Sequence, residues 1–285
     1  MEERHLIVVP DELRKMRLED ALLTLFPRVS KMYIRELVRG GRCEVNGREE
    51  NIGRRLRAGD LIEIDVDAAR GTAMRPEVMA LDIVFEDAHI LVVNKPAGML
   101  MHPSHRENTR TLLNGVVHHL NDGRERIIRP GLPHRLDKQT SGLVVIAKTP
   151  KAHRRLSAGF MRKLVEKRYL AVVEGIVTAD SDTIFAPIGR YAELKHWSVK
   201  DDGKHSESRF LVRERRYDTT LLELEPVTGR TNQLRIHCEL IGHPIVGDIE
   251  RGGRRAERLF LHAFRLCFKH PATGEMMEFE RAAEF

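Results

Sequence analysis

The apolar run Leu143-Val144-Val145-Ile146-Ala147 directly follows the polar segment Pro133-His134-Arg135-Leu136-Asp137-Lys138-Gln139-Thr140-Ser141-Gly142. The run is short, unbroken and mostly β-branched, which predicts a strand buried on both faces of a sheet. A polar loop held by such a strand presents its side chains from a rigid support. Asp137 is the only carboxylate in this loop. Taken alone, an Asp in a loop is most often a surface residue that pairs weakly with a neighbour.

The composition is that of a chain with a hydrophobic core and a heavily charged surface. Of the 285 residues, 41% are hydrophobic and 32% are charged, which suits one large domain or a small domain beside a medium one. The formal net charge of +6 favours a polyanionic partner, as weak evidence only. Because aromatic residues make up 5%, any contact with nucleic acid should depend on Arg and Lys at phosphates rather than on a broad stacking platform.

The cysteine content and the length of the apolar runs indicate the cellular compartment in which we expect the protein. Cys43, Cys238 and Cys267 form no C-x-x-C pair, so we expect neither a disulfide framework nor a cysteine zinc site. This usage fits a reducing compartment. The first residues lack a basic segment followed by an apolar one, and no apolar run approaches about 18 residues. We therefore expect no signal peptide, no membrane span and a cytoplasmic location.

The first 67 residues carry the signals of a compact unit with two helices, a hairpin and a strand. Ser30 is a candidate N-cap for a helix over residues 31–39. Asn46-Gly47 favours a hairpin with a type I′ turn, and residues 61–67 alternate strictly between apolar and acidic, as in a half-buried strand. An earlier helix is predicted by apolar residues at helical spacing, namely Leu18, Ala21, Leu22 and Leu25.

A basic stripe follows the predicted helix over residues 31–39. Three of its basic residues are spaced by four and share one face, opposite the apolar side of the helix. Charge alone favours contact with an RNA backbone and a solvated helix face about equally. The basic residues that we assign to this surface are Arg28, Lys31, Arg35, Arg39, Arg42 and Arg48.

Residues 30–48 read S-K-M-Y-I-R-E-L-V-R-G-G-R-C-E-V-N-G-R, and this pattern resembles the S4 domain, a small RNA-binding module. The resemblance implies an S4-like α/β domain over residues 11–67 that contacts RNA through the basic stripe. Residues 68–80 show neither helical nor strand periodicity and predict a linker. A catalytic domain would then span residues 81–285.

Four segments of that second part resemble the motifs of the RluA-type family of RNA pseudouridine synthases. They are V-N-K-P-A-G-M-L-M-H-P-S at 93–104, H-R-L-D-K-Q-T-S-G-L-V-V-I-A-K at 134–148, K-R-Y-L-A-V-V-E-G at 167–175 and T-G-R-T-N-Q-L-R-I-H at 228–237. The second of these is long and matches with almost no gaps. Together with the S4-like pattern, the resemblance covers nearly the whole chain.

The resemblance implies roles for five residues. Asp137 would be the catalytic nucleophile, Tyr169 would line the uracil pocket, and Arg235 would pair with the aspartate. Arg135 would fill the space that the target base leaves in the RNA, a task that suits a planar guanidinium. Leu234 would contact the substrate. The three residues assigned to catalysis are therefore Asp137, Tyr169 and Arg235.

Pseudouridine formation needs neither a cofactor nor a metal, because no atom of the nucleoside is gained or lost overall. A carboxylate nucleophile can attack the ribose C1′ or the uracil C6, and the sequence leaves both open. The target base must leave its stack at a cost of a few kcal/mol. A cation beside Asp137 would offset its loss of water, and Arg235 is the candidate. Asn232 stands where the family has His, a change that we expect to alter substrate contacts more than the chemistry.

The family resemblance implies an α+β fold, with a mixed, mainly antiparallel sheet and a central cleft in the catalytic domain. Hairpins predicted over residues 83–95 and 259–279 agree with this architecture. The S4-like module and the basic surface weakly favour large-subunit ribosomal RNA, of the 23S type, over transfer RNA as partner. We expect a monomer.

Other classes of function stay open. A non-enzymatic RNA-binding or ribosome-assembly protein of the same fold is disfavoured because all three implied catalytic residues are present. A transfer-RNA-directed synthase would use the same site. A metal-dependent RNA hydrolase would need ligands from four histidines, which have neither i, i+4 spacing nor a carboxylate at ligand spacing, so we expect no metal site. These histidines are His102, His105, His118 and His119.

Overall fold

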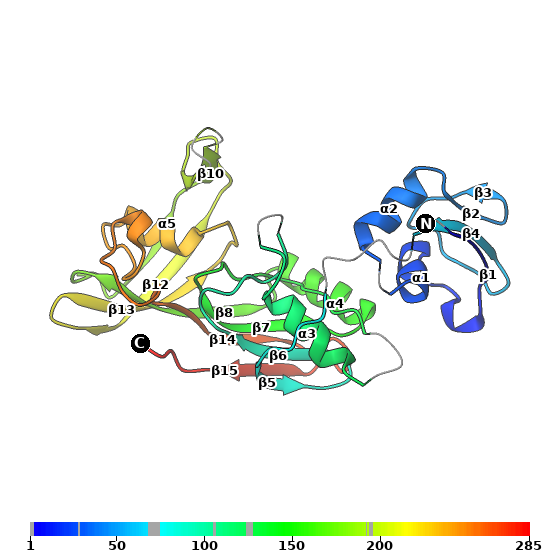
Figure 1. Ribbon diagram of the computed structural model, residues 1–285. Helices are drawn as coiled ribbons and strands as arrows, with labels where there is room; N and C mark the ends of the chain where they lie inside the picture. The colour runs from blue at the N-terminus through cyan, green and yellow to red at the C-terminus, as the bar shows by residue number, and fades with distance from the viewer. Residues whose placement is uncertain are drawn as a thin grey trace. The chain divides into compact units, whose positions relative to one another are not determined.

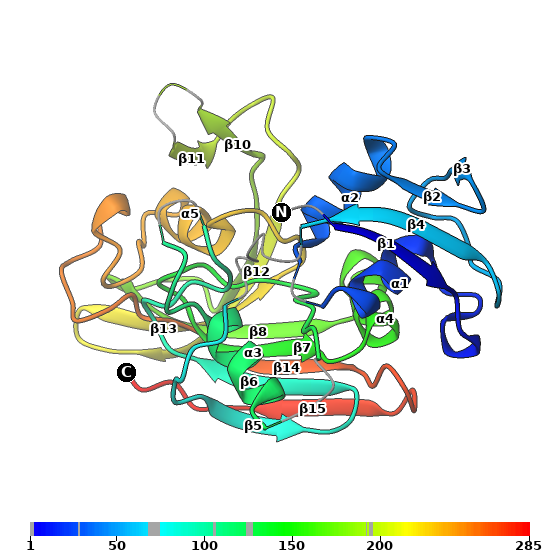
Figure 2. The same cartoon turned by 45° about the vertical axis from the view of Figure 1, so that its right-hand side comes forward.

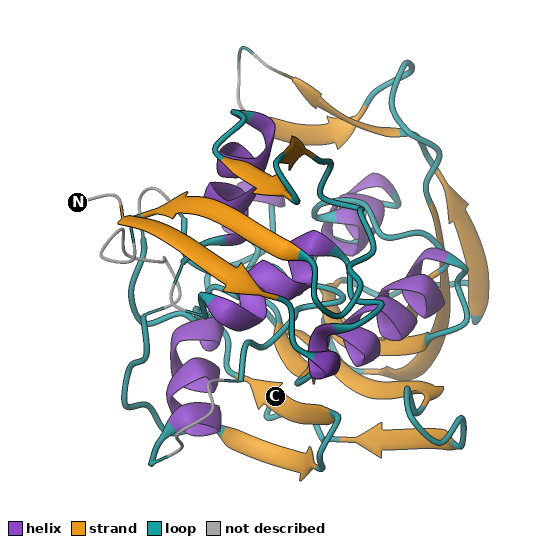
Figure 3. Ribbon diagram, turned by 90° about the vertical axis from the view of Figure 1, so that its right-hand side faces the viewer, coloured by secondary structure: helices purple, strands orange, loops and turns teal. Residues whose placement is uncertain are grey.

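The computed structural model describes residues 3–27, 29–67, 75–104, 107–123, 128–191, 193 and 196–285. The chain forms two compact units, and helices and strands occur in both, so the protein is α+β (Figure 3). Arg28, His105 and residues 68–74 of the predicted linker lie outside the described residues. Unit 1 comprises Met1–Val78, Pro103–Thr109 and Val116–Arg129, and unit 2 comprises Met79–His102, Arg110–Gly115 and Pro130–Phe285.

Unit 1 packs two helices on a four-stranded antiparallel sheet with the strand order β1-β4-β2-β3 (Figure 1). One hydrophobic cluster, formed by residues of both helices and of the sheet, makes its core. The elements are β1 (Glu3–Val8), η1 (Asp11–Leu13), α1 (Leu18–Leu25), α2 (Lys31–Arg39), β2 (Cys43–Val45), β3 (Arg48–Glu49) and β4 (Leu61–Val66).

The local predictions for this unit are confirmed. The Ser30 hydroxyl accepts a hydrogen bond from the Tyr33 amide at 3.0 Å, which caps α2. Asn46 and Gly47 have φ of +54° and +70°, as a type I′ turn requires. In β4, Ile62, Ile64 and Val66 are buried while the acidic residues between them are partly exposed. Pattern and turn chemistry agree here, so the local sequence specifies the elements.

Unit 2 is built on a nine-stranded sheet with the order β5-β6-β7-β14-β8-β13-β12-β9, with β15 paired to β14. Among the described strand pairs only β7 and β14 run parallel, so the sheet is mixed and mainly antiparallel, as predicted. Its strands are β5 (Asp82–Glu86), β6 (Ile90–Lys95), β7 (Ser141–Ala147), β8 (Glu166–Glu174), β9 (Ser181–Phe185), β12 (Glu207–Arg215), β13 (Thr219–Pro226), β14 (Leu261–Lys269) and β15 (Met276–Glu280).

All seven residues of β7 are buried, which confirms the predicted strand covered on both faces. Gly142 begins the apolar part of this strand with a φ of +120°, a conformation open to glycine. A Cβ on Gly142 would lie 2.4 to 2.7 Å from backbone atoms of Ala263 in β14. The parallel pairing of β7 with β14 therefore depends on this glycine, which stands five residues after Asp137.

Helix α4 (Pro150–Met161) covers one face of β6, β7 and β14, where Leu156 and Ala152 join the apolar cluster of these strands. Helix α4 ends at Met161. Lys163 has a φ of +57°, so the chain leaves the helical path there. Helix α3 (Leu112–Asn121) precedes the Asp137 loop in the chain.

The segment of residues 176–220 contains strands that the sequence did not reveal. Besides β9, these are β10 (Ile188–Tyr191) and β11 (His196–Val199), which form a separate two-stranded sheet. In Figures 1 and 2 this hairpin stands apart from the large sheet, beyond helix α5 (Gln233–Leu240). A short η2 (Ile249–Arg251) follows α5. Within the described part of the chain, no helix has the length and apolar character needed to cross a membrane.

Candidate active site

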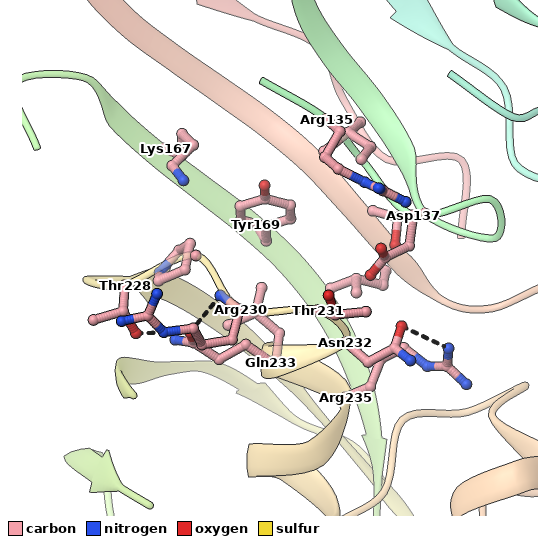
Figure 4. A pocket seen from close by; sticks show the side chains of 16 residues that line it. Arg135, Asp137, Lys167, Tyr169, Thr228, Arg230, Thr231, Asn232, Gln233 and Arg235 are labelled. Atoms are coloured by element: carbon pink, nitrogen blue, oxygen red, sulfur yellow. Dashed lines mark hydrogen bonds between the residues drawn. The ribbon is translucent and has the colours of Figure 1, made fainter. Parts of the chain in front are cut away.

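A pocket of about 130 Å³ in unit 2 gathers all five residues implied for catalysis and substrate contact. Four parts of the chain form its walls: the loop before β7, strand β8, the segment from the end of β13 to the first turn of α5, and Leu261 of β14 (Figure 4). The five predicted residues among those that line it are Arg135, Asp137, Tyr169, Leu234 and Arg235. Segments as far apart as residues 135 and 235 therefore meet at one site, as the motifs predict.

A buried lysine, Lys95, holds the Asp137 loop through hydrogen bonds. Lys95, at the end of β6, is fully buried, and its Nζ donates to the carbonyl oxygens of Pro96 at 2.8 Å, Met99 at 2.9 Å and Lys138 at 3.3 Å. The Lys138 carbonyl also accepts from the Gly98 amide at 2.8 Å. The loop of the V-N-K-P-A-G segment is thus joined to the residue next to Asp137, which holds the carboxylate in position.

The Asp137 carboxylate itself forms no hydrogen bond or ion pair with any residue that the structure describes, and the side chain is partly exposed to the pocket. The Asp137 carbonyl accepts from the Thr140 amide at 3.2 Å, which closes the turn. A carboxylate that faces a pocket without a protein partner is available to a substrate. This geometry suits a nucleophile.

Tyr169, on β8, is 8% exposed and lies on the pocket wall between Lys167 and Asp137 (Figure 4). Burial raises the pKa of the Tyr169 phenol, and the negative charge of Asp137 raises it further. The phenol therefore keeps its proton at neutral pH and can donate that proton or a hydrogen bond.

The expected ion pair between Arg235 and Asp137 is wrong for this structure. The Arg235 guanidinium donates through Nε to Asp248 Oδ2 at 2.6 Å and through Nη2 to Asp248 Oδ1 at 2.6 Å and Glu250 Oε2 at 3.0 Å. Burial lowers the pKa of Arg235, but these two carboxylates outweigh it and raise the pKa. A guanidinium already held by a bidentate carboxylate has little to gain from a third, more distant one.

Asn232, which stands in place of the family's His, adopts the left-handed conformation with a φ of +55° at the N-cap of α5. Asn tolerates this conformation better than most residues. Its Oδ1 accepts from Arg235 Nη1 at 3.2 Å. Asn232 also lines the pocket. The side chain therefore helps to orient Arg235 rather than standing apart from the site.

The rest of the T-G-R-T-N-Q-L-R segment is held together by Gln233, which is buried. Its Oε1 accepts from the Thr228 hydroxyl at 2.7 Å and the Arg230 amide at 3.0 Å, while Nε2 donates to the Glu207 carbonyl at 2.8 Å and the Ser208 hydroxyl at 2.9 Å. The side-chain amide of Gln233 thus holds the loop of the motif together and attaches that loop to β12. The sequence reading did not assign this role, although Gln at this place in the motif was the visible signal.

Two cations that line or adjoin the site were not singled out from the sequence. Lys167, two residues before Tyr169, lines the pocket, and burial lowers the pKa of its amine. Arg258 donates to the Ser141 hydroxyl, which also bonds the His262 Nδ1 at 2.8 Å. Both contacts are made by Ser141, the first residue of β7, which follows the Asp137 loop. The charge of Arg258 also lowers the pKa of Lys95.

Lys95 leads to a prediction about pH. Burial lowers the pKa of Lys95 from 10.5 to about 7, although the charge of Asp137 opposes the shift. The lysine amine therefore binds its proton more tightly in the unfolded chain than in the folded protein. Below pH 7 Lys95 is charged in both states, and the cost of burying that charge lowers the free energy of unfolding most. Between pH 7 and 10.5 the folded protein has lost this proton while the unfolded chain keeps it, so the destabilisation decreases as the pH rises. The free energy of unfolding should gain up to about 1.4 kcal/mol per pH unit in this window from Lys95. Lys95→Met should lose this gain, as urea unfolding across the window would measure. Parallel pH curves for the two proteins would contradict the assignment.

In unit 1, the predicted basic stripe is partly neutralised. Lys31 and Arg35 both form ion pairs with Glu19 of α1, with Lys31 Nζ at 2.9 Å from Glu19 Oε2. Burial raises the pKa of Glu19, but the bonds from Arg35 and Lys31 outweigh it and lower the pKa. Arg39 and Arg48 are exposed on the surface of the unit. The charge available to a partner is therefore smaller than the sequence alone indicates.

Metal ligation finds no support in the described ranges, which contain no group of three His, Cys, Asp or Glu side chains placed to hold an ion. His105, one of the four histidines considered from the sequence, lies outside those ranges.

Comparison with known proteins agrees with this geometry. The family model for RNA pseudouridylate synthase matches residues 89–240. The chain is 39% identical over 280 residues to the Bacillus subtilis (strain 168) protein named "Uncharacterized RNA pseudouridine synthase YlyB", covering 96% of this chain and 92% of the relative. It is 36% identical over 289 residues to ribosomal large subunit pseudouridine synthase D of Pseudomonas aeruginosa, covering 95% and 90%.

A solved structure, that of human RNA pseudouridylate synthase domain containing 1, superposes with a TM-score of 0.62 at 28% identity, over 75% of this chain and 86% of that one. The fold and the pocket thus define an RNA-modifying isomerase. The chain belongs to the RluA-type family of RNA pseudouridine synthases.

Proposed function

We propose that the protein converts specific uridines of large-subunit ribosomal RNA to pseudouridine, with Asp137 as nucleophile and without a cofactor. The observation that carries the proposal is the pocket in which the unpaired Asp137 carboxylate faces Tyr169 and the 228–235 loop. The ribosomal substrate is supported by two relatives that are named ribosomal large subunit pseudouridine synthase D, of whose lengths the matches cover 90% and 79%.

In the proposed reaction, the N1–C1′ bond of the target uridine breaks and a C5–C1′ bond forms after the uracil turns. Asp137 attacks C1′ or C6 and is released at the end, so it is unchanged overall. The proton on C5 leaves to solvent, and N1 ends with a proton. Tyr169 keeps its phenol proton and can stabilise the turning base by donating a hydrogen bond, while Arg135, exposed at the pocket rim, occupies the place of the flipped base.

Residues 11–67 are proposed to form an S4-like RNA-binding domain, joined by residues 68–80 to a catalytic domain over residues 81–285, and the protein is proposed to act as a monomer. Arg39 and Arg48 are exposed, Arg42 is partly exposed, and Lys31 and Arg35 share Glu19. These five and Arg28 are the basic residues assigned to RNA. The exposed pair should contribute most, because their charges are not offset by Glu19.

The first experiment measures tritium release from RNA labelled at uridine C5. Large-subunit ribosomal RNA lacking pseudouridine is the first substrate and transfer RNA the second. Release from ribosomal RNA that is unaffected by a chelator supports the proposal. Release from transfer RNA alone would change the substrate, and tight binding of ribosomal RNA without release would favour a binding or assembly role.

The basic stripe gives a separate prediction. The double substitution Arg39→Gln and Arg48→Gln should weaken binding of ribosomal RNA and reduce the slope of log affinity against log salt by up to about 2, because two phosphate contacts are lost. Filter binding at several salt concentrations measures both quantities. Arg14→Gln, which removes an exposed charge beside η1, is the matched control and should leave the slope nearly unchanged. Equal slopes for the double variant and the wild type would show the stripe to be solvated charge.

A further inference from the structure

A second hollow, of about 380 Å³, opens beside the active-site pocket in unit 2. The two share Gly229, Arg230 and Thr231 of the motif loop as lining residues, so they are continuous along this loop. The opposite wall of the second hollow is the β10–β11 hairpin, which stands beyond α5 in Figure 2. The chemistry proposed above uses only the first pocket, and the second has no role in it.

The second hollow is strongly basic. Four cations line it against a single carboxylate, Asp202, which is already paired with Lys200 at 2.9 Å. The Arg190 and Lys204 side chains bond none of the residues that the structure describes. Arg230 uses its Nε to donate to the His205 carbonyl at 3.1 Å, which orients the guanidinium. Such a surface suits an anionic ligand.

An aromatic residue lies among these charges. Trp197, the only tryptophan of the chain, is partly buried on β11, opposite Arg190 in the strand register. Its carbonyl accepts from Arg251 Nη2 at 2.8 Å, and Arg251 is itself buried and paired with Glu239 of α5. The strand that carries the indole is thus tied to the helix that begins in the active site.

The floor of the hollow is backbone. Lys204 exchanges two hydrogen bonds of 2.9 Å with Ile188 of β10, and a Cβ on Gly203 would lie 2.6 Å from the Ile188 carbonyl carbon. Only a glycine allows this approach. The segment that presents Lys204 is therefore fixed against the hairpin, and the cations and the indole are held in place before any ligand arrives.

We propose that this hollow binds the nucleotide adjacent to the target uridine, with its base against Trp197 and its phosphates at Arg190, Lys204 and Arg230. An aromatic face beside a line of cations is the arrangement that binds single-stranded nucleic acid. The shared loop leads from this hollow to Asp137, so a strand with its uridine in the first pocket passes directly into the second. The inference rests on the proposed function, because it takes the RNA strand to be the substrate.

The test uses the intrinsic fluorescence of Trp197, which reports on this hollow alone because the chain has no other tryptophan. The full-length protein is titrated with a short oligouridylate, whose binding is followed in parallel by the anisotropy of an end label, and with inorganic phosphate. We expect quenching that follows oligouridylate binding and no quenching by phosphate. Bound oligouridylate with unchanged fluorescence would overturn the proposal.

Three variants separate stacking from charge. Trp197→Ala should weaken oligouridylate binding roughly 5- to 100-fold, and Trp197→Phe, which keeps an aromatic face, should recover most of this loss. Lys204→Met should reduce the salt slope by about 0.7. Lys269→Met removes an exposed charge at the end of β14 and serves as control. Wild-type affinity for Trp197→Ala, or a salt slope for Lys204→Met equal to that of the control, would overturn the proposal.

Tritium release from ribosomal RNA, measured on the same preparations, keeps the two proposals apart. If the wild type releases tritium but its Trp197 fluorescence does not change when oligouridylate binds, the nucleotide site in the second hollow is overturned and the proposed function is retained. Quenching by oligouridylate without release from any RNA supports the hollow as a single-strand site and overturns the isomerase assignment for the RNA tested.

Discussion

Asp137→Asn should abolish isomerisation while leaving the protein folded. The carboxylate bonds no described residue, so its replacement by an isosteric amide removes no contact that stabilises unit 2. The amide cannot act as a nucleophile, and turnover should fall by roughly 10⁴-fold or more. Tritium release from C5-labelled ribosomal RNA measures the loss, and urea unfolding checks the fold.

A matched control is Asp182→Asn, the same chemical change on the edge strand β9 outside both hollows. It should retain wild-type turnover. RNA affinity of Asp137→Asn should also stay near that of the wild type, because the phosphate contacts are elsewhere. Substantial isomerisation by Asp137→Asn would show that Asp137 is not the nucleophile, and another group of the pocket would then have to take this role.

Arg235→Ala should destabilise unit 2 by about 3–5 kcal/mol, because it leaves the Asp248 carboxylate buried without its partner. The two side chains are 11% and 1% exposed, and the pair is bidentate. The double variant Arg235→Ala with Asp248→Asn should regain a large part of this loss, since the unpaired charge is gone. Urea unfolding of the two single variants and the double variant gives the coupling free energy.

The same double variant separates structure from chemistry. If Arg235 acts on the substrate, the double variant recovers stability but not turnover, which is the expected result. If Arg235 serves only to neutralise Asp248, turnover returns with the fold. Arg254→Ala is a suitable control, because Arg254 pairs with Glu174 and Asp218 at the surface, and its loss should change stability little.

The sequence predicted those parts of the fold in which local pattern and local chemistry agree. The buried strand β7, the capped helix α2 and the hairpins around β6 and β14 follow from apolar runs, a Ser N-cap and turn residues. Strands β9, β10 and β11 were missed because they are short and mixed in polarity. They take their structure from neighbours distant in sequence, which no local period reveals.

The sequence predicted which residues form the site, but not which side chains they contact. The motifs bring Asp137, Tyr169 and Arg235 into one pocket, as expected. The partner of Arg235 could not be derived, because Asp248 is one of many carboxylates and only the fold of the loop after α5 brings it close. The burial of Lys95 was equally hidden, since a lysine at a strand end is usually exposed. Two of the three carbonyl oxygens around it come from the turn after β6, and the third comes from the Asp137 loop.

The place of β14 in the sheet has a consequence for the order in which the molecule is assembled. β7 and β8 are joined by α4, yet they are not neighbours, because β14 lies between them with Ser141 opposite His262. Until β14 has been synthesised, both strands have an open edge and the Asp137 loop lacks its support. Pairings of such long sequence separation form slowly. We therefore expect that the nascent chain on the ribosome has no active site until residues beyond 260 have emerged, and that catalytic competence arrives late in folding.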